Sequence, residues 1–187
     1  MTTAQTTTVT HLWETSLLVQ EPDLDDILRL RVNLLDQGSG SCTDLPLSAA
    51  VRDENLLTGT LSIAMRQLQE RDEARGVDTA PITGVTCRLM VWRGGYEAPV
   101  LDTPGSYAAW LFLQAVAPAH KDSGSLAIYD PRAGAAMHAV PGLPWGRQFT
   151  VRPRAGTLAV VPGWLTSALM PVEEGQVIAA ICAISTH

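Results

Sequence analysis

Asp102 is the residue of this sequence whose position best suits acid–base chemistry. It follows Val100 by two residues within the stretch "GGYEAPVLDTPG", and side chains at i and i+2 of a strand face the same way. A carboxylate that faces an apolar interior is costly unless it is paired or protonated, and burial raises its pKa toward a range useful for proton transfer. The alternative is a solvated aspartate at a strand end, because "DTPG" also favours a turn.

Arg88 is a second candidate for a polar group in such an interior. It lies in "TCRLMVW", where the alternation of a strand places it on the same face as Met90 and Trp92, toward the interior of a barrel. There its guanidinium would pair with Asp102 or with an anionic ligand. The alternative is an arginine on an edge strand that reaches solvent.

The cysteines and two of the histidines do not have the spacing of a metal site. Cys42, Cys87 and Cys182 are far apart, odd in number and without a CxxC pair, a pattern typical of free thiols in a reducing cytoplasm. His120 and His138 lie in predicted loops, with neither a His-x-His nor an i, i+4 relation to another ligand. Loop histidines without a metal role are the simpler interpretation, and a role as displaced metal ligands stays open.

Composition limits the partners of the chain. Its 187 residues suffice for one domain with a sizeable core, and a net charge of −6 argues against a nucleic-acid partner. No apolar run reaches the roughly 18 residues that span a bilayer, and the N-terminus lacks the basic and apolar regions of a signal peptide. We therefore expect a cytoplasmic protein with a small-molecule substrate and no nucleic-acid or membrane partner, and a homodimer stays open.

The N-terminal part is predicted to be mainly helical. Residues 1–10 read as a frayed polar tail, and residues 11–80 as the helical part of a single domain that spans 1–187. Apolar residues at helical spacing predict helices near 24–36 and 58–75, and "SGSCTDLPLSAA" between them reads as a loop.

After residue 80 the pattern changes to short apolar segments rich in β-forming residues. Gly and Pro separate these segments, as in "RGGYEAP", "DTPG" and "VVPGW". Regularly spaced short strands with such turns are typical of a β-sandwich or barrel.

Residues 85–185 resemble the iron(II)- and 2-oxoglutarate-dependent oxygenases, and are closest to a bacterial subgroup of them. The likeness rests on "GGYEAP", "SGSLAIYDPRAGAAMHAVPG", "VRPRAGTLAVVPGWL" and "VIAAICAIS". The resemblance implies a mainly β fold, with a double-stranded β-helix (jelly-roll, cupin-like) core behind N-terminal α-helices. It also implies an iron held by two histidines and one carboxylate, with open positions for 2-oxoglutarate and oxygen.

The sequence departs from this family at its functional positions. Val100 stands where the resemblance places the first histidine, and Asp102 holds the carboxylate position. Ser167 stands at the second histidine, and Val177 stands at the arginine that pairs with 2-oxoglutarate. Valine cannot coordinate a metal, a serine hydroxyl is a poor iron(II) ligand, and loss of the arginine removes a bidentate anchor. We therefore expect a degenerate metal site and no cofactor.

The jelly-roll interior would then be an apolar pocket with a few polar groups. Asp102 is its expected acid or base, and Arg88 and Ser167 are expected to orient substrate or stabilise charge. A covalent role for Ser167 is disfavoured, because the chain has no G-x-S-x-G elbow. Trp164 belongs to the scaffold motif, which also favours a core position for it. The residues expected to line the pocket are Val100, Trp110, Tyr107, Trp92, Met90, Trp164 and Val177.

Three functions are compatible with this pattern. The first is a metal-independent enzyme of bacterial secondary metabolism that performs acid–base cyclisation, isomerisation or dehydration. The second is a non-catalytic relative that binds a ligand or a partner. The third is an iron and 2-oxoglutarate hydroxylase with displaced ligands. Fold-level analogy alone does not decide among them.

Overall fold

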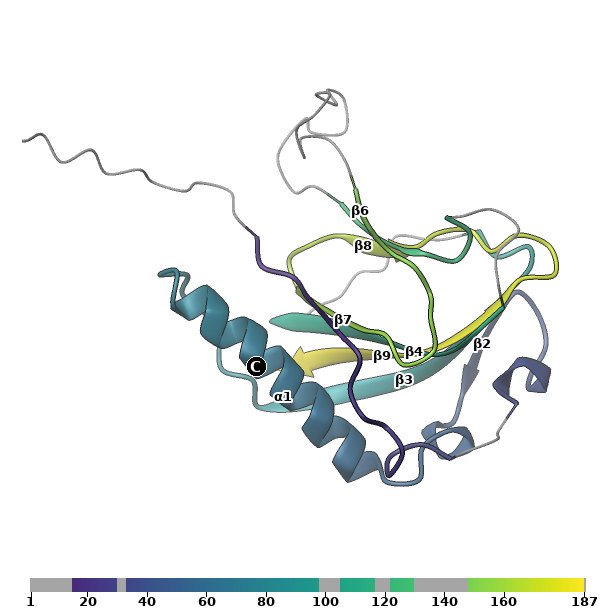
Figure 1. The fold of residues 1–187 in the computed structure, drawn as a ribbon, viewed down its shortest axis with the longest axis horizontal. Coiled ribbons are helices and arrows are strands. Elements are labelled where there is room, and N and C mark those ends of the chain that lie inside the picture. Colours follow the sequence, from purple (N-terminus) through teal and green to yellow (C-terminus); the bar gives the residue numbers. More distant parts are fainter. Residues whose placement is uncertain (1–14, 30–32, 98–104, 117–121, 130–147, 187) are drawn as a thin grey trace, which may run out of the picture.

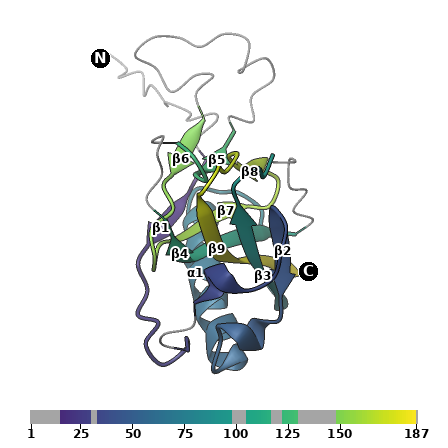
Figure 2. The same ribbon diagram turned by 90° about the vertical axis from the view of Figure 1, so that its right-hand side faces the viewer.

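The computed structural model of the chain describes residues 15–29, 33–97, 105–116, 122–129 and 148–186. A six-stranded antiparallel sheet forms its middle layer, with helix α1 (Glu54–Glu73) on one face and a three-stranded sheet over the other (Figures 1 and 2). Of the described residues, therefore, most of the regular structure is β. No helix among them is long and apolar enough to cross a membrane.

Helix α1 forms where the sequence combines a cap with an apolar stripe. The Asp53 side chain accepts a hydrogen bond from the Leu56 amide at 3.0 Å, which satisfies one free N–H of the first turn. Gly76, at φ 80°, follows the end of the helix. The helix predicted near 58–75 is thus confirmed, and begins slightly earlier. Its buried stripe is Leu57, Leu61, Ala64, Met65 and Leu68.

The helix predicted at 24–36 is wrong. Leu24, Ile27 and Leu34 are buried, but the first two lie in a turn rather than a helix. The Asp23 carboxylate accepts from the Asp25 amide at 3.2 Å, and Leu28 forms a β-bridge with Val51. A short 3₁₀ turn follows at Leu34–Asp36. Side chains that bond to their own backbone favour turns over helices, so helical spacing alone gave the wrong element here.

The two sheets are antiparallel throughout. The large sheet has the order β1-β7-β4-β9-β3-β2, and the small sheet has the order β6-β5-β8. The segment predicted as a loop after residue 38 contains β2, which pairs with β3 at the edge of the large sheet. The strands of the large sheet are β1 (Leu18–Gln20), β2 (Cys42–Leu45), β3 (Gly84–Arg93), β4 (Tyr107–Ala115), β7 (Leu158–Pro162) and β9 (Val177–Thr186). Those of the small sheet are β5 (Leu126–Ile128), β6 (Phe149–Val151) and β8 (Ser167–Leu169).

The path of the chain between the sheets defines a jelly roll. It runs through β3 and β4 in the large sheet, β5 and β6 in the small one, β7 in the large, β8 in the small and β9 in the large. As a result β4 lies between β7 and β9, which are distant from it in sequence. Crossing from sheet to sheet in this way is the pattern of a double-stranded β-helix, and the predicted fold class is confirmed.

Alternation along the large sheet divides its side chains between two cores. On β3, Leu89 and Val91 join a helix-side core with the buried stripe of α1. Met90 and Trp92 point the other way, into a core between the two sheets. We call the region between the two sheets, whose described side chains form this second core, the inter-sheet space. The four central strands contribute apolar side chains to both cores, so both faces of the sheet need cover.

We predict that the helix-side core makes a large contribution to stability. Leu61 is fully buried, whereas Ile63, two residues further along the same helix, is 60% exposed. Leu61→Ala should lower the free energy of unfolding by about 2–5 kcal/mol, because it removes buried methyl groups and leaves a cavity. Ile63→Ala should change it by less than about 0.5 kcal/mol. Urea unfolding of both variants measures this, and equal losses would contradict the assignment of the core.

Candidate functional site

Three aromatic rings lie close together in the inter-sheet space. The rings of Trp92 and Trp110 lie 6.0 Å apart between centroids, and the Tyr96 ring lies 6.2 Å from Trp92. Both tryptophans are about 1% exposed. Trp92 comes from β3 and Trp110 from β4, two strands that are separated by β9 in the sheet. Large rings therefore span three strands of the wall that faces the small sheet.

Ser167 brings a polar atom into this apolar space. It opens β8, pairs in register with Ile128, and alternates with Leu169. Both of these neighbours belong to the inter-sheet core, so the Ser167 side chain faces it too. The Ser167 hydroxyl is fully buried and has no hydrogen-bond partner among the described residues. A buried hydroxyl without a partner is costly. Ser125 carries another such hydroxyl, but it precedes Leu126, whose side chain enters the inter-sheet core, so strand alternation directs Ser125 to the opposite face. Ser167 is the one of the two that faces the inter-sheet core.

The turn before β8 fixes the position of Ser167, the first residue of that strand. The Gly163 amide donates to the Ser106 carbonyl at 2.8 Å. A side chain at Gly163 would run into the backbone carbonyl of Gly105, so the close approach of these two segments requires glycine. The "PGWL" motif thus ties the start of β8 to the chain that enters β4.

The groups that titrate in the inter-sheet space are neutral at ordinary pH. Burial raises the pKa of the Tyr96 hydroxyl, and it raises the pKa of the Cys182 thiol strongly. Cys182 packs against the inter-sheet core from β9. Asp72 is the one charged side chain that is buried among the described residues, and it lies on the helix side, where it accepts a hydrogen bond from Tyr107. The described walls are therefore apolar, with hydroxyl and thiol groups.

Three of the predicted lining residues lie on the inter-sheet face. Met90, Trp92 and Trp110 all pack into or against the inter-sheet core. Strand alternation was sufficient to place them, because each lies in a long strand with both faces covered. That they contact substrate stays a prediction.

Arg88 does not pair within the site as predicted. It is on the same strand face as Met90, in the middle of β3, but its Nε and Nη2 donate to Asp44 Oδ2 at 3.0 and 2.7 Å. The hydrogen bond with Asp44 raises the pKa of Arg88 further. The two side chains are 60% and 49% exposed. β2, which sequence reasoning missed, supplies this partner, and an exposed pair of this kind contributes little to stability.

Tyr107 and Val177 face the wrong way for the predicted pocket. Tyr107 is buried in the helix-side core, and its hydroxyl donates to Asp72 of α1 at 3.2 Å. Val177 opens β9, as expected, but its side chain packs on the same helix side. The inward residues of β9 are Ile178, Ala180 and Cys182. A shift of one residue along a strand reverses the face, and this is the reason for the error at Val177.

Trp164 is not in the core that the scaffold motif favoured. It is 61% exposed, on the turn between β7 and β8, while the next residue, Leu165, is buried. The motif thus uses Leu165 as its apolar anchor. Val100, Asp102, His120 and His138 lie outside the described residues.

Sequence reasoning missed Tyr96 and Cys182 as lining residues. Tyr96 lies in "GGYEAP" and forms a β-bridge with Val172, so its place follows from a long-range pairing that no local pattern reveals. Cys182 had a usable signal, because it alternates with Ile178 and Ala180 along β9.

The described donors differ from those of an iron site. Among the described residues, no three His, Cys, Asp or Glu side chains lie close enough together to hold a metal ion. The inward face of β9 carries no guanidinium, and β8 presents the neutral hydroxyl of Ser167. A hydroxyl and a protonated thiol are weak ligands for iron(II).

No family model matches the sequence, and no curated protein matches it. Solved structures do resemble it. A prolyl-4-hydroxylase from Pseudomonas putida has a TM-score of 0.45 at 16% identity, over 78% of this chain and 71% of that one. HygX from Streptomyces hygroscopicus was solved with nickel, 2-oxoglutarate and hygromycin B bound. It has a TM-score of 0.44 at 14% identity, over 92% of this chain and 83% of that one. A prolyl hydroxylase from Trichoplax adhaerens has a TM-score of 0.44 at 17% identity. The match covers 66% of this chain and 53% of that one, so this chain spans about half the length of that protein.

We predict opposite effects for two buried serines. Ser185 receives a hydrogen bond from the Tyr107 amide at 2.6 Å and donates to the Tyr107 carbonyl at 3.1 Å. Ser185→Ala should therefore lower the free energy of unfolding by about 1–2 kcal/mol. Ser167→Ala should raise it by about 1 kcal/mol, because it removes a buried hydroxyl that has no partner. Urea unfolding measures both. A larger loss for Ser167→Ala than for Ser185→Ala would show that Ser167 has a structural role instead.

Proposed function

We propose that the chain is a small-molecule enzyme whose site is the inter-sheet space and which works without iron or 2-oxoglutarate. Its reaction would be an acid–base cyclisation, isomerisation or dehydration. The observation that carries the proposal is the Ser167 hydroxyl, which is fully buried, without a partner among the described residues, and directed into the apolar core between the sheets, to which Trp92 and Trp110 also belong. Stability does not explain such a group, whereas a bound substrate would.

The described donors support a site without iron. The position that the resemblance gives to a histidine holds Ser167, and the inward residues of β9 are Ile178, Ala180 and Cys182. This set does not fit iron(II) with a 2-oxoglutarate carboxylate, because it offers neither an imidazole nor a guanidinium at those places. No step of the proposed reaction therefore runs through a metal.

Proton transfer is assigned to Asp102, on its sequence position beside Val100. Its carboxyl group would take a proton from the substrate or give one to it. The Ser167 hydroxyl would donate a hydrogen bond to a substrate oxygen, holding that group in place and stabilising charge as it develops there. The apolar walls would exclude water, which strengthens both interactions.

The aromatic walls indicate the kind of substrate. Trp92, Trp110 and Tyr96 offer flat, apolar surface with few polar atoms. A largely hydrocarbon or polyunsaturated molecule with one oxygen function would match such walls better than a sugar or a nucleotide.

We predict that the mass of the product will identify the class of reaction. Purified protein is incubated with a small-molecule extract, and the compounds consumed and formed are followed by mass spectrometry. Cyclisation or isomerisation gives a product of unchanged mass, and dehydration gives the loss of one water. Asp102→Asn should slow this conversion by about 10²–10⁴-fold, because the amide cannot exchange a proton in the same way.

The matched control is Asp44→Asn, which changes a carboxylate in the exposed pair with Arg88 and should leave the conversion unchanged. Full activity of a well-folded Asp102→Asn protein would refute the assigned acid–base role. A product that has gained one oxygen atom would favour the hydroxylase with displaced ligands. Binding of a compound without conversion would favour the non-catalytic relative.

A further inference from the structure

A cavity lies on the helix side of the large sheet, away from the inter-sheet space. It has a volume of about 390 Å³ and lies between the C-terminal half of α1 and the segment that enters β1. Its polar lining comes from Gln67 and Arg71 of the helix, from Arg75 in the turn after it, and from Thr15 and Ser16 of the segment. Leucines of both elements complete it. The volume is in the range of small-molecule sites.

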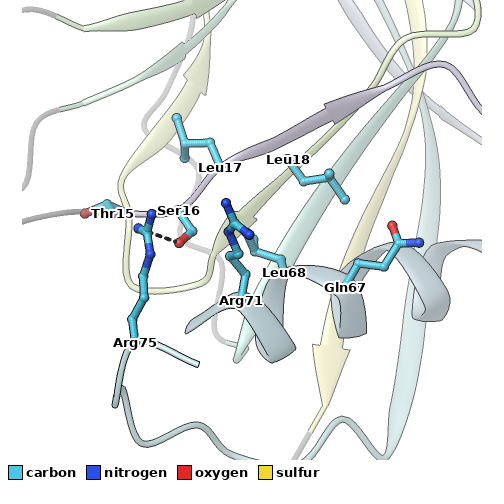
Figure 3. A pocket seen from close by; sticks show the side chains of 8 residues that line it. All are labelled: Thr15, Ser16, Leu17, Leu18, Gln67, Leu68, Arg71 and Arg75. Atoms are coloured by element: carbon cyan, nitrogen blue, oxygen red, sulfur yellow. Dashed lines mark hydrogen bonds between the residues drawn. The ribbon is translucent and has the colours of Figure 1, made fainter. Parts of the chain in front are cut away.

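Two guanidinium groups extend into the same side of this cavity. Arg71 lies in the last turn of α1, and Arg75 lies in the turn that follows the helix. Figure 3 shows both side chains extending toward residues 15–18. Two like charges on the same side of a cavity repel each other. An anion between them would turn the repulsion into attraction.

The two guanidinium groups of the cavity differ in their hydrogen bonds within the protein. Arg75 Nη1 donates to the buried Ser16 Oγ at 3.2 Å, which holds one guanidinium against the segment (Figure 3). The Arg71 side chain has no hydrogen bond or ion pair with any described residue. Its planar fork is therefore the donor that remains for a ligand, and it suits a carboxylate or phosphate group.

The acidic residues of this part of α1 point elsewhere. Asp72 is buried and accepts the Tyr107 hydroxyl, while Glu73 accepts hydrogen bonds from Gln69 and Thr79. Glu70 and Glu73 line a different cavity, together with Arg66. The helix thus places its carboxylates away from the cavity of Arg71 and Arg75. The described polar lining of that cavity is cationic or neutral.

We propose that this cavity binds a small organic anion. A carboxylate or phosphate group would lie against Arg71 and Arg75, with a hydroxyl of Thr15 or Ser16 as a further donor. A short hydrocarbon portion would contact Leu17, Leu18 and Leu68. The volume exceeds what a bare inorganic anion fills, and the leucines need an apolar part to cover them. The proposal is independent of the function assigned to the inter-sheet space.

The test is calorimetric titration of the full chain at constant ionic strength with four probes. Hexanoate and hexyl phosphate carry the two candidate oxyanions on the same chain, and the stronger binder identifies which group the site prefers. Inorganic phosphate lacks the chain, and hexanol lacks the charge. We expect saturable 1:1 binding of at least one amphiphilic anion, with binding of inorganic phosphate and hexanol at least about tenfold weaker.

Arg71→Gln should weaken binding of the preferred anion by at least about tenfold, since a hydrogen bond to a charged group is lost. Arg71→Lys keeps the charge but not the fork, and should bind with intermediate affinity. The matched control is Arg66→Gln, which removes the same charge from the same helix outside this cavity and should bind as the wild type does. Arg71 is exposed, so its variants are expected to fold, and circular dichroism checks this. Equal loss in Arg66→Gln and Arg71→Gln, equal binding of hexanol, or no saturable binding of either anion would overturn the proposal.

Discussion

The structure depends on one constraint: the large sheet is apolar on both faces. Along β4, Tyr107, Ala109 and Leu111 enter the helix-side core, whereas Ala108, Trp110 and Phe112 enter the inter-sheet core. Such a sheet is stable in water only with a layer on each side. Helix α1 covers one face and the small sheet covers the other. The inter-sheet space, and with it the candidate site, is a consequence of this second layer.

This constraint also determines the electrostatics of the two sides. On the helix side, the one buried charge of the described chain, Asp72, is held by the Tyr107 hydroxyl. On the other side, the described groups that titrate are a phenol and a thiol whose pKa values are raised by burial, and both remain neutral. A neutral, apolar region into which the Ser167 hydroxyl points without a described partner suits an uncharged substrate. It suits a dianionic cosubstrate poorly, because nothing in the described walls compensates two charges.

The sequence predicted elements whose signals are strong and local. Helix α1 has a cap, an apolar stripe and a terminal glycine, and the long strands β3, β4 and β9 have alternating apolar faces, so their inward residues Met90, Trp92 and Trp110 could be assigned. Prediction failed where contact with a segment distant in sequence determines which element forms. Leu24 and Ile27 have helical spacing but are buried by a turn, and β2 exists because the edge of β3 is there to pair with it.

At the candidate site too, local sequence predicts some side-chain positions, whereas distant segments determine others. The Arg88 guanidinium pairs with Asp44 because β2 brings that carboxylate to the strand edge, which no pattern around Arg88 reveals. Val177 was assigned inward on a motif position, yet a register difference of one residue gives that role to Ile178. Ser167 was selected as a substituted metal ligand. Its buried hydroxyl without a described partner is a property that only coordinates can supply.

The central claim is that the inter-sheet space works without iron and 2-oxoglutarate, and one combined measurement tests it most directly. The protein is loaded with iron(II) under anaerobic conditions, desalted and assayed for bound iron, and then supplied with 2-oxoglutarate and oxygen while succinate is measured. Our account predicts substoichiometric iron and no succinate above the level without protein, since Ser167 and the inward face of β9 provide neither ligand nor anchor. One iron per chain together with succinate formation would contradict it.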